Sequence, residues 1–211
     1  MTGLRSYHDP CGIARALDLV GERWALLIVR ELVFGPKRFT DLRGGLAGAS
    51  PNVLSQRLRE LEMSGIVRRR KIGAASYELT AWGLELRAIL IQLGRWGARS
   101  PDRPMGALSV DALMVALEST FDAGAAAGVR ALYELRLGDE RFAIHIDHGT
   151  IDIARGTPRR PDAVIDAAPA ILRAVVFGDR TLESAPIELS GDKRAARAFF
   201  RLFSRPAPRP T

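Results

Sequence analysis

The sequence predicts an α+β protein with two domains, an N-terminal winged helix-turn-helix and a C-terminal domain built on an antiparallel sheet. Three observations support this prediction. Residues 36–71 read as a short helix, a tight turn, a longer amphipathic helix and a strand that opens with four cations. Residues 100–106 are rich in Pro and Gly, as is typical of a domain boundary. Beyond them, short strands bounded by turn residues are interspersed with helices.

The N-terminal elements follow from apolar periodicity and from helix start and stop residues. Ser50 and Pro51 mark a helix start, because Ser caps free N–H groups and Pro is tolerated at the first helical position. The turn before that helix is expected at three glycines, Gly44, Gly45 and Gly48. The expected helices span residues 13–20, 24–33, 39–43, 51–64 and 81–96, and a hairpin joins strands 66–72 and 76–80.

The helix 51–64 has the chemistry of a DNA-reading element. Leu54, Leu58 and Leu61 form one apolar stripe, which leaves the polar side chains on the other faces. Such a helix fits the DNA major groove, where Asn and Gln can bond adenine and Arg can reach guanine or phosphate. The expected DNA contacts are Arg38, Thr40, Ser50, Asn52, Ser55, Gln56, Arg57, Arg59, Arg68, Arg69, Arg70 and Lys71. Because strand side chains alternate between faces, about two of the last four would touch one DNA backbone.

The positive charge is confined to the same half of the chain. Residues 1–100 hold 16 Lys+Arg against 9 Asp+Glu, a net charge of +7, whereas residues 101–211 hold 15 against 15. This asymmetry favours a polyanion-binding module joined to a domain with a different task. The alternative, an Arg-rich composition inherited from a GC-rich genome, does not account for the asymmetry.

The C-terminal half is expected to be a second α+β domain. Its helices are expected at residues 109–119, 170–177 and 192–203, and its strands at 130–137, 141–147, 151–154, 163–167 and 187–189. His145 and His148 would lie on opposite faces of a strand, which argues against a metal site. No motif of a catalytic or cofactor-binding site occurs, so we expect neither an enzyme, nor a metal, nor a cofactor.

Several blocks of residues 11–100 resemble the HxlR family of winged helix-turn-helix regulators, relatives of the MarR group. The matching pieces, besides Cys11, are ALDLVGERWALLIVREL at 16–32, GPKRFTDL at 35–42, LSQRLRELEMSGIVRR at 54–69, YELTAWG at 77–83 and LGRWG at 93–97. The resemblance implies a homodimer that binds double-stranded DNA at inverted-repeat operators, and a repressor is the expectation. Gly12 stands where the family often has Pro. The short wing tip, GAAS at 73–76, puts deep insertion into the minor groove in doubt.

Residues 130–203 resemble the sterol carrier protein type-two-like fold. The matching pieces are YELRLGDERFAIHIDHGTIDIARG at 133–156, PDAVIDAAPAILRAVVFG at 161–178 and IELSGDKRAARAFFRLF at 187–203. In that fold a sheet and its helices enclose an apolar tunnel, so an apolar small molecule is an implied ligand. The implied lining is Leu132, Phe142, Ile144, Ile146, Leu172, Val176, Phe177, Phe199 and Phe203. The same side chains could equally fill an ordinary core.

Cys11 is the single cysteine of the chain, which excludes an internal disulfide and fits a reducing compartment. In some relatives a Cys at this place senses oxidants, and a thiolate near Arg15 and a helix N-terminus could be activated. A small buried residue at the helix start is the alternative. No signal peptide or membrane span is evident, so we expect a cytoplasmic protein without a membrane partner.

These observations predict four regions: residues 1–100 as the DNA-binding and dimerisation domain, 101–107 as a linker, 108–205 as the sterol-carrier-like domain and 206–211 as a flexible tail. The expected function is sequence-specific regulation of transcription. An apolar ligand bound in the C-terminal domain could control this regulation. The alternative is a lipid- or small-molecule-binding protein whose winged helix mediates protein contacts.

Overall fold

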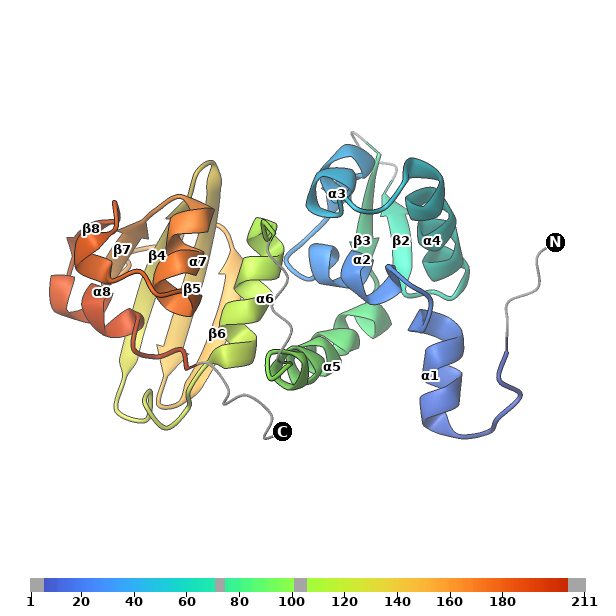
Figure 1. The fold of residues 1–211 in the computed structure, drawn as a ribbon, viewed down its shortest axis with the longest axis horizontal. Helices are drawn as coiled ribbons and strands as arrows, with labels where there is room; N and C mark the ends of the chain where they lie inside the picture. Colours follow the sequence, from blue (N-terminus) through green and yellow to red (C-terminus); the bar gives the residue numbers. More distant parts are fainter. Residues whose placement is uncertain (1–5, 71–74, 101–105, 205–211) are drawn as a thin grey trace. The chain divides into compact units, whose positions relative to one another are not determined.

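The computed structural model describes residues 6–70, 75–100 and 106–204, and its chain forms two compact units (Figure 1). The units are Met1–Leu90 and Ile91–Thr211, and the division falls inside the long helix α5 (Ala81–Gly97). Because of this division, α5 contributes residues to both units. The Pro- and Gly-rich segment at 100–106 follows the end of the helix in the sequence. None of the helices in the described ranges is both long and apolar enough to cross a membrane.

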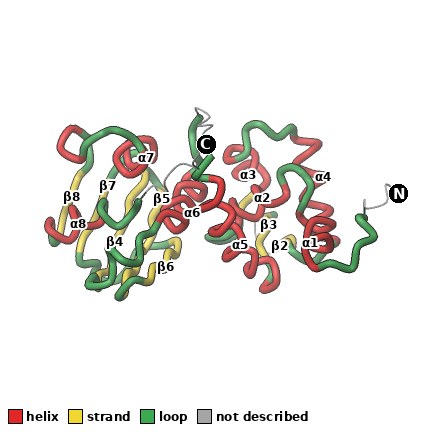
Figure 2. The backbone as a smooth tube through the Cα atoms, turned by 60° about the horizontal axis from the view of Figure 1, so that its bottom comes forward, coloured by secondary structure: helices red, strands yellow, loops and turns green. Residues whose placement is uncertain are grey.

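The first unit is a winged helix-turn-helix. Its elements before α5 are α1 (Gly12–Val20), α2 (Ala25–Leu32), β1 (Lys37–Arg38), α3 (Phe39–Gly45), α4 (Pro51–Met63), β2 (Val67–Arg70) and β3 (Ser76–Leu79). The three strands pair antiparallel in the order β1-β3-β2. A loop joins α3 to α4 (Figure 2). The core lies between the helices and the small sheet, and its fully buried side chains include Ile28, Leu32, Leu42, Leu54, Leu58 and Leu61.

The expected helices of this unit are confirmed, and two details differ. Gly44 and Gly45 belong to the last turn of α3, and the connection to α4 begins only at Leu46. A Cβ on Gly45 would lie 2.4 Å from Oε2 of Glu31, so the helix continues because glycine leaves room for that carboxylate. The second difference is β1, a strand of two residues, which is too short to show a periodic pattern.

Glu31 is a buried carboxylate, 0% exposed, that ties α2 to β1. Its Oε1 accepts a bond from Arg30 at 2.8 Å, and its Oε2 pairs with Nζ of Lys37 at 2.9 Å. Burial of a lone carboxylate would be costly, so the two cations are needed to hold it there. Lys37 is thereby drawn inward, while its neighbour Arg38 stays exposed.

The junction between the wing and α5 depends on Thr80 and Gly83. The Thr80 hydroxyl donates to the carbonyl of Gly65 at 2.7 Å and accepts from the Gly83 N–H at 3.0 Å, which caps the start of α5. A Cβ on Gly83 would lie 2.2 Å from the carbonyl oxygen of Ile66. The helix therefore rests directly on the backbone that enters β2, and only glycine permits this approach.

The second unit is a five-stranded sheet with helices on one face (Figure 1). After the end of α5 its elements are α6 (Val110–Thr120), β4 (Arg130–Leu137), β5 (Glu140–Asp147), β6 (Thr150–Arg155), β7 (Ala163–Asp166), α7 (Pro169–Phe177), the 3-10 helix η1 (Leu182–Ser184), β8 (Glu188–Gly191) and α8 (Lys193–Phe199). The strand order is β6-β5-β4-β7-β8.

The sheet is mixed, so the expectation of a purely antiparallel sheet is wrong. β4 and β7 pair in parallel, with Tyr133 opposite Ala163, whereas the other pairs are antiparallel. The segment 156–162 returns the chain to the start of β4, so β7 runs in the same direction as β4. Asp162 holds the start of β7 beside β4. Its Oδ2 accepts from the Leu132 N–H at 2.7 Å, and its own N–H donates to the Leu132 carbonyl at 2.8 Å.

The core of the second unit lies between the sheet and α6, α7 and α8. Directly paired residues such as Tyr133 with Ile144 and Leu135 with Phe142 share the face that the helices cover. Arg155 fixes α6 to the sheet, because its guanidinium pairs with the buried Asp111 at 2.7 Å.

The last helix is shorter than expected. α8 ends at Phe199, and a turn follows instead of helix up to residue 203. The turn brings Phe203 into a β-bridge with Phe121, and the rings of Phe199 and Phe203 pack 4.8 Å apart. Aromatic packing and the bridge thus replace the final helical turn.

Candidate nucleic-acid interface

Helix α4 presents its polar side chains as one stripe. Ser50 caps the helix by accepting a bond from the Val53 N–H at 3.4 Å, and Pro51 opens it, as expected. The leucines turn inward, which leaves Asn52, Gln56 and Arg59 exposed at spacings of four and three residues. Ser55, half-buried, borders the same stripe. The arrangement matches the geometry by which a helix reads base edges in a major groove.

Gln56 has a partner on its own helix. Its Nε2 donates to Oε1 of Glu60 at 3.0 Å, and both side chains are at the surface of α4. Arg59 is exposed and forms no ion pair with any described residue. The guanidinium of Arg59 can therefore turn toward an incoming phosphate or guanine without losing an intramolecular bond.

Arg57 has a structural position, which differs from the expected DNA contact. Its side chain is only 15% exposed and pairs with Oε2 of Glu22 at 3.0 Å and with Oε2 of Glu60. Glu22 lies between α1 and α2, so Arg57 links α4 to that connection. The turn of the helix explains the difference, because position 57 points toward the protein when positions 52, 56 and 59 point away.

Replacing Arg57 with Ala should therefore reduce stability more than the equivalent change at Arg59. The Arg57→Ala change leaves Glu22 and Glu60 without their shared cation, and we expect a loss of about 1–2 kcal/mol. The Arg59→Ala change should stay within about 0.5 kcal/mol of the parent protein. Thermal and urea unfolding of both variants measure this, and equal stabilities would contradict the structural role of Arg57.

The wing and β1 gather cations on one face of the small sheet. Arg68 lies opposite Glu78, while Arg70 and Arg38 both lie opposite Ser76, so these side chains share a face. Arg69 points to the other face with Tyr77, and its guanidinium lies 5.9 Å from the centre of that ring. Two of the three described wing arginines thus face one way, which confirms the expected alternation.

Glu78 partly neutralises this face. Its carboxylate pairs with Arg68 at 2.7 Å and with Arg70 at 3.4 Å, and both guanidinium groups remain exposed. With Arg38 the face carries three cations against one anion, so it stays positive. Lys71 and the first two residues of the wing tip, Gly73 and Ala74, lie outside the described residues.

The start of α3 also differs in detail from the expectation. The Arg38 N–H and the Thr40 hydroxyl both donate to the carboxylate of Asp41, at 3.1 and 3.3 Å. A phosphate at this helix end would have to compete with that carboxylate. The cross-strand position of Arg38 beside the wing therefore supports a phosphate contact better than the helix terminus does.

Cys11 is exposed rather than buried, so the alternative of a small buried residue is wrong. It occupies the N-cap position of α1, and its N–H donates to Oδ1 of Asp9 at 2.8 Å. A sensing role for the thiol stays a prediction.

The side chains expected to line an apolar tunnel do not all share one interior. Six of them are buried in the second unit: Phe142, Ile144, Ile146, Leu172, Phe199 and Phe203. Val176 and Phe177 are half-buried on α7. Leu132 pairs with His145, on the face opposite to that of Ile144 and Phe142, so its placement in the same lining is wrong.

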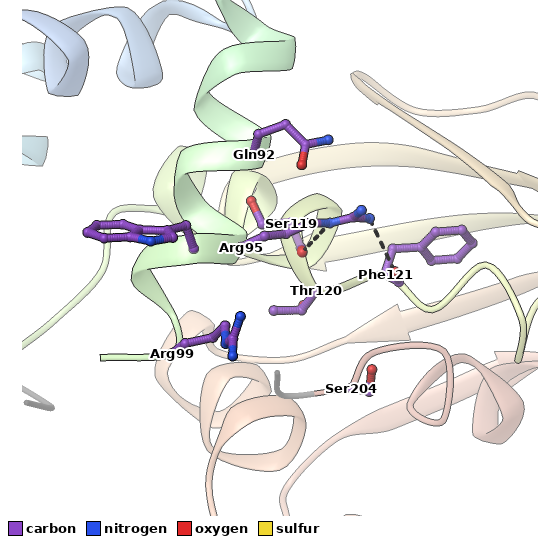
Figure 3. Close-up of a pocket in the computed structure, with 8 residues that line it drawn as sticks. Gln92, Arg95, Arg99, Ser119, Thr120, Phe121 and Ser204 are labelled. Atoms are coloured by element: carbon purple, nitrogen blue, oxygen red, sulfur yellow. Dashed lines mark hydrogen bonds between the residues drawn. The ribbon is translucent and has the colours of Figure 1, made fainter. Parts of the chain in front are cut away.

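A pocket of about 380 Å³ lies elsewhere in the second unit, between the last turns of α5 and the end of α6 (Figure 3). Its lining is Gln92, Arg95, Trp96, Arg99, Ser119, Thr120, Phe121 and Ser204. Arg95 donates to the Ser119 carbonyl at 2.9 Å and to the Phe121 carbonyl at 3.5 Å, which satisfies free carbonyls at the end of α6. Six of the eight lining residues are polar, and none of the side chains expected for an apolar tunnel is among them.

The fold and the exposed stripe of α4 beside a cationic wing define a DNA-binding protein of the winged-helix class. The model of the HxlR-like helix-turn-helix family matches residues 19–104. The chain is 38% identical over 86 residues to the uncharacterized HTH-type transcriptional regulator YvaP of Bacillus subtilis, and the match covers 39% of this chain and 80% of YvaP. The chain therefore belongs to the HxlR-like family of transcriptional regulators. These proteins are not enzymes, which confirms that expectation.

Two solved structures are similar in sequence to part of the chain. The quinone-bound YodB of B. subtilis is 35% identical, with 40% of this chain and 93% of YodB covered and a TM-score of 0.37. The redox regulator HypR in its oxidized form is 32% identical, with 44% of this chain and all of HypR covered and a TM-score of 0.40. The family model ends at residue 104, so it says nothing of the sheet of the second unit.

Proposed function

We propose that the protein is a homodimeric repressor that binds an inverted-repeat operator through α4 and the wing. The observation that carries this proposal is the stripe of Asn52, Gln56 and Arg59 on α4, exposed and adjacent in helical spacing, on a fold whose wing sheet is cationic. Carboxamides and guanidinium groups in this arrangement select bases, and the wing arginines supply phosphate contacts that are independent of sequence.

The dimer is proposed from an exposed apolar seam along α5. Trp82, Leu86, Ile89, Leu93 and Trp96 follow one another at spacings of four and three residues, the pattern of a coiled-coil seam. Ile89 is 55% exposed and Trp96 is 75% exposed, whereas side chains of this kind are normally covered. A second copy of the same helix would cover this seam. The two α4 helices would then meet successive major grooves, about 34 Å apart.

The second unit is proposed as the regulatory part, of sterol-carrier-like type. A sheet covered on one face by three helices, with Phe142, Ile144 and Phe199 buried between, is compatible with that fold. The ligand would be an apolar small molecule that shifts the dimer between two arrangements with different affinity for DNA. Native mass spectrometry of the purified protein tests for such a ligand, and a ligand-free mass from every preparation would count against it.

Cys11 offers a second proposed input. YodB has been solved with a bound quinone and HypR in an oxidized form, and both are relatives of this chain. An exposed thiol at the start of α1 is accessible to oxidants and electrophiles. If a quinone abolishes DNA binding of the Cys11→Ser variant as it does that of the parent protein, the thiol is not the sensor and this role is ruled out.

Selection of genomic fragments by the purified protein, followed by affinity measurements, tests DNA recognition. Replacing Gln56 and Arg59 together with Ala should weaken operator binding by about 100-fold, because each base contact contributes about 1–3 kcal/mol. The matched control is Arg130→Ala in the second unit, which removes an exposed cation without touching α4. Equal affinity of the parent protein for the operator and for a scrambled duplex would overturn sequence-specific recognition.

A further inference from the structure

The charge of the second half is neutral in total but strongly divided along the chain. Residues 193–211 contain six Lys+Arg and no Asp or Glu, a net charge of +6. Residues 101–192 contain the remaining nine Lys+Arg against fifteen Asp+Glu, a net charge of −6. Five of the six cations recur at every fourth position: Lys193, Arg197, Arg201, Arg205 and Arg209. Composition alone would scatter arginines among acids, as it does in residues 101–192.

The structure orients the described part of this series outward. α8 packs on β7 and β8 with Ala196 and Phe199 fully buried. Its remaining faces, with the turn that follows, expose four cations: Lys193, Arg194, Arg197 and Arg201. The apolar side of the helix is thus buried in the core, and the exposed side of the helix is cationic. We call these four residues the α8 basic face.

The α8 basic face differs from most of the other arginines that the structure describes in this unit. Arg136 pairs with Glu134 at 3.0 Å, Arg155 pairs with Asp111, and Arg180 donates to the Ser184 carbonyl at 3.1 Å. By contrast, the side chains of the α8 basic face make no ion pair or hydrogen bond with any residue that the structure describes. Asp192, the nearest acid in sequence, is occupied as the N-cap of α8 and accepts from the N–H groups of Arg194 and Ala195.

We propose that the α8 basic face is a second DNA-contact surface, which binds the phosphate backbone of duplex DNA without regard to sequence. This inference rests on the proposed DNA-binding function. Cations four residues apart on a helix are separated by about 6 Å along its axis. Each DNA strand carries one charge about every 3.4 Å along the duplex axis, so successive side chains can meet separate phosphates. The guanidinium group suits phosphate because it donates two parallel hydrogen bonds.

Duplex DNA fits this surface better than an anionic membrane does. Helices that lie on membranes insert an apolar face beneath their basic residues. In α8 that apolar face is buried against β7 and β8, so the exposed surface offers charge without an apolar wedge. A polyanion that is contacted from outside, such as a duplex, needs only the charge.

The test compares two full-length variants that lose the same charge. One replaces the α8 basic face (K193Q/R194Q/R197Q/R201Q), and the other replaces four exposed arginines elsewhere in the unit (R130Q/R159Q/R160Q/R180Q). Binding to a duplex without operator is measured over a series of salt concentrations. The α8 variant should bind at least tenfold more weakly at low salt, and its salt slope should fall by about 2–4, since each phosphate contact contributes about 0.9.

The control variant should lose less than threefold in affinity. Equal losses in both variants would reduce the effect to net charge and overturn the proposal. So would unchanged DNA binding of the α8 variant together with a loss of its binding to vesicles of anionic phospholipid. The Gln56→Ala, Arg59→Ala variant is measured in parallel: if it alone loses operator binding, the proposed function stands and the α8 surface is excluded.

Discussion

Replacing Ile89 and Leu93 with Asp should separate the proposed dimer into monomers and reduce operator affinity by about 100-fold or more. Both side chains lie in the seam of α5 and are exposed in the single chain. Two charges from each copy would have to be buried without partners if the helices paired. A monomer can contact only one half-site of the operator. In a dimer, binding of the first half-site raises the effective concentration of the second α4 helix at the other half-site, and a monomer loses this contribution to affinity.

Analytical ultracentrifugation and operator titration measure the two effects on the same sample. The matched control is Leu84→Asp, because Leu84 is also exposed on α5 but lies on a different side of the helix from Ile89 and Leu93. The control should keep the mass of two chains and its operator affinity. Monomers that still bind the operator with the parent affinity would refute the proposed link between dimerisation and recognition.

The winged helix could be predicted from the sequence because its signals are local. Ser50 and Pro51 start α4, three leucines define its buried face, and the helix ends just before Gly65, as expected. Turn residues alone, however, could not tell that Gly44 and Gly45 continue α3. Their role depends on Glu31, a residue of another helix whose carboxylate occupies the space beside Gly45.

The candidate site was predictable as a set but not residue by residue. A stripe of polar residues on an amphipathic helix follows from periodicity, and Asn52, Gln56 and Arg59 are exposed accordingly. Arg57 lies on the same helix and has the same chemistry as Arg59, but it meets Glu22 from the connection between α1 and α2. Long-range pairing of this kind leaves no trace in local spacing. The same holds for Arg38, which β1 places beside the wing.

In the second unit, alternation identified the strands but could not order them. β4 matches its expected limits, and β5, β6 and β7 differ by a residue or so. The parallel pairing of β7 with β4 depends on the path of residues 156–162, for which the sequence has no periodic signal. The assignment of Leu132 to a tunnel was wrong for a related reason, because its register with His145 decides which face it occupies.

Replacing Gly83 with Ala should destabilise the first unit by about 2 kcal/mol. Helix propensity alone favours Ala over Gly by about 1 kcal/mol, so a Gly→Ala change inside a helix normally stabilises the folded protein. Here the added Cβ would lie 2.2 Å from the Ile66 carbonyl oxygen, a backbone atom that cannot rotate away. The start of α5 would have to shift, which costs about 3 kcal/mol or more through overpacking and through the hydrogen bonds of Thr80.

The same helix contains its own control. A Cβ on Gly97, the last residue of α5, would meet no described atom within 4 Å, so Gly97→Ala should leave stability unchanged or raise it by a few tenths of a kcal/mol. Urea unfolding with a probe in the first unit would measure both variants. Equal effects would mean that helix propensity decides, whereas opposite signs would show that Gly83 is required for the contact between α5 and the backbone of Ile66. Since α5 also carries the proposed dimer seam, a shifted α5 in Gly83→Ala should weaken operator binding even at temperatures where the variant is folded.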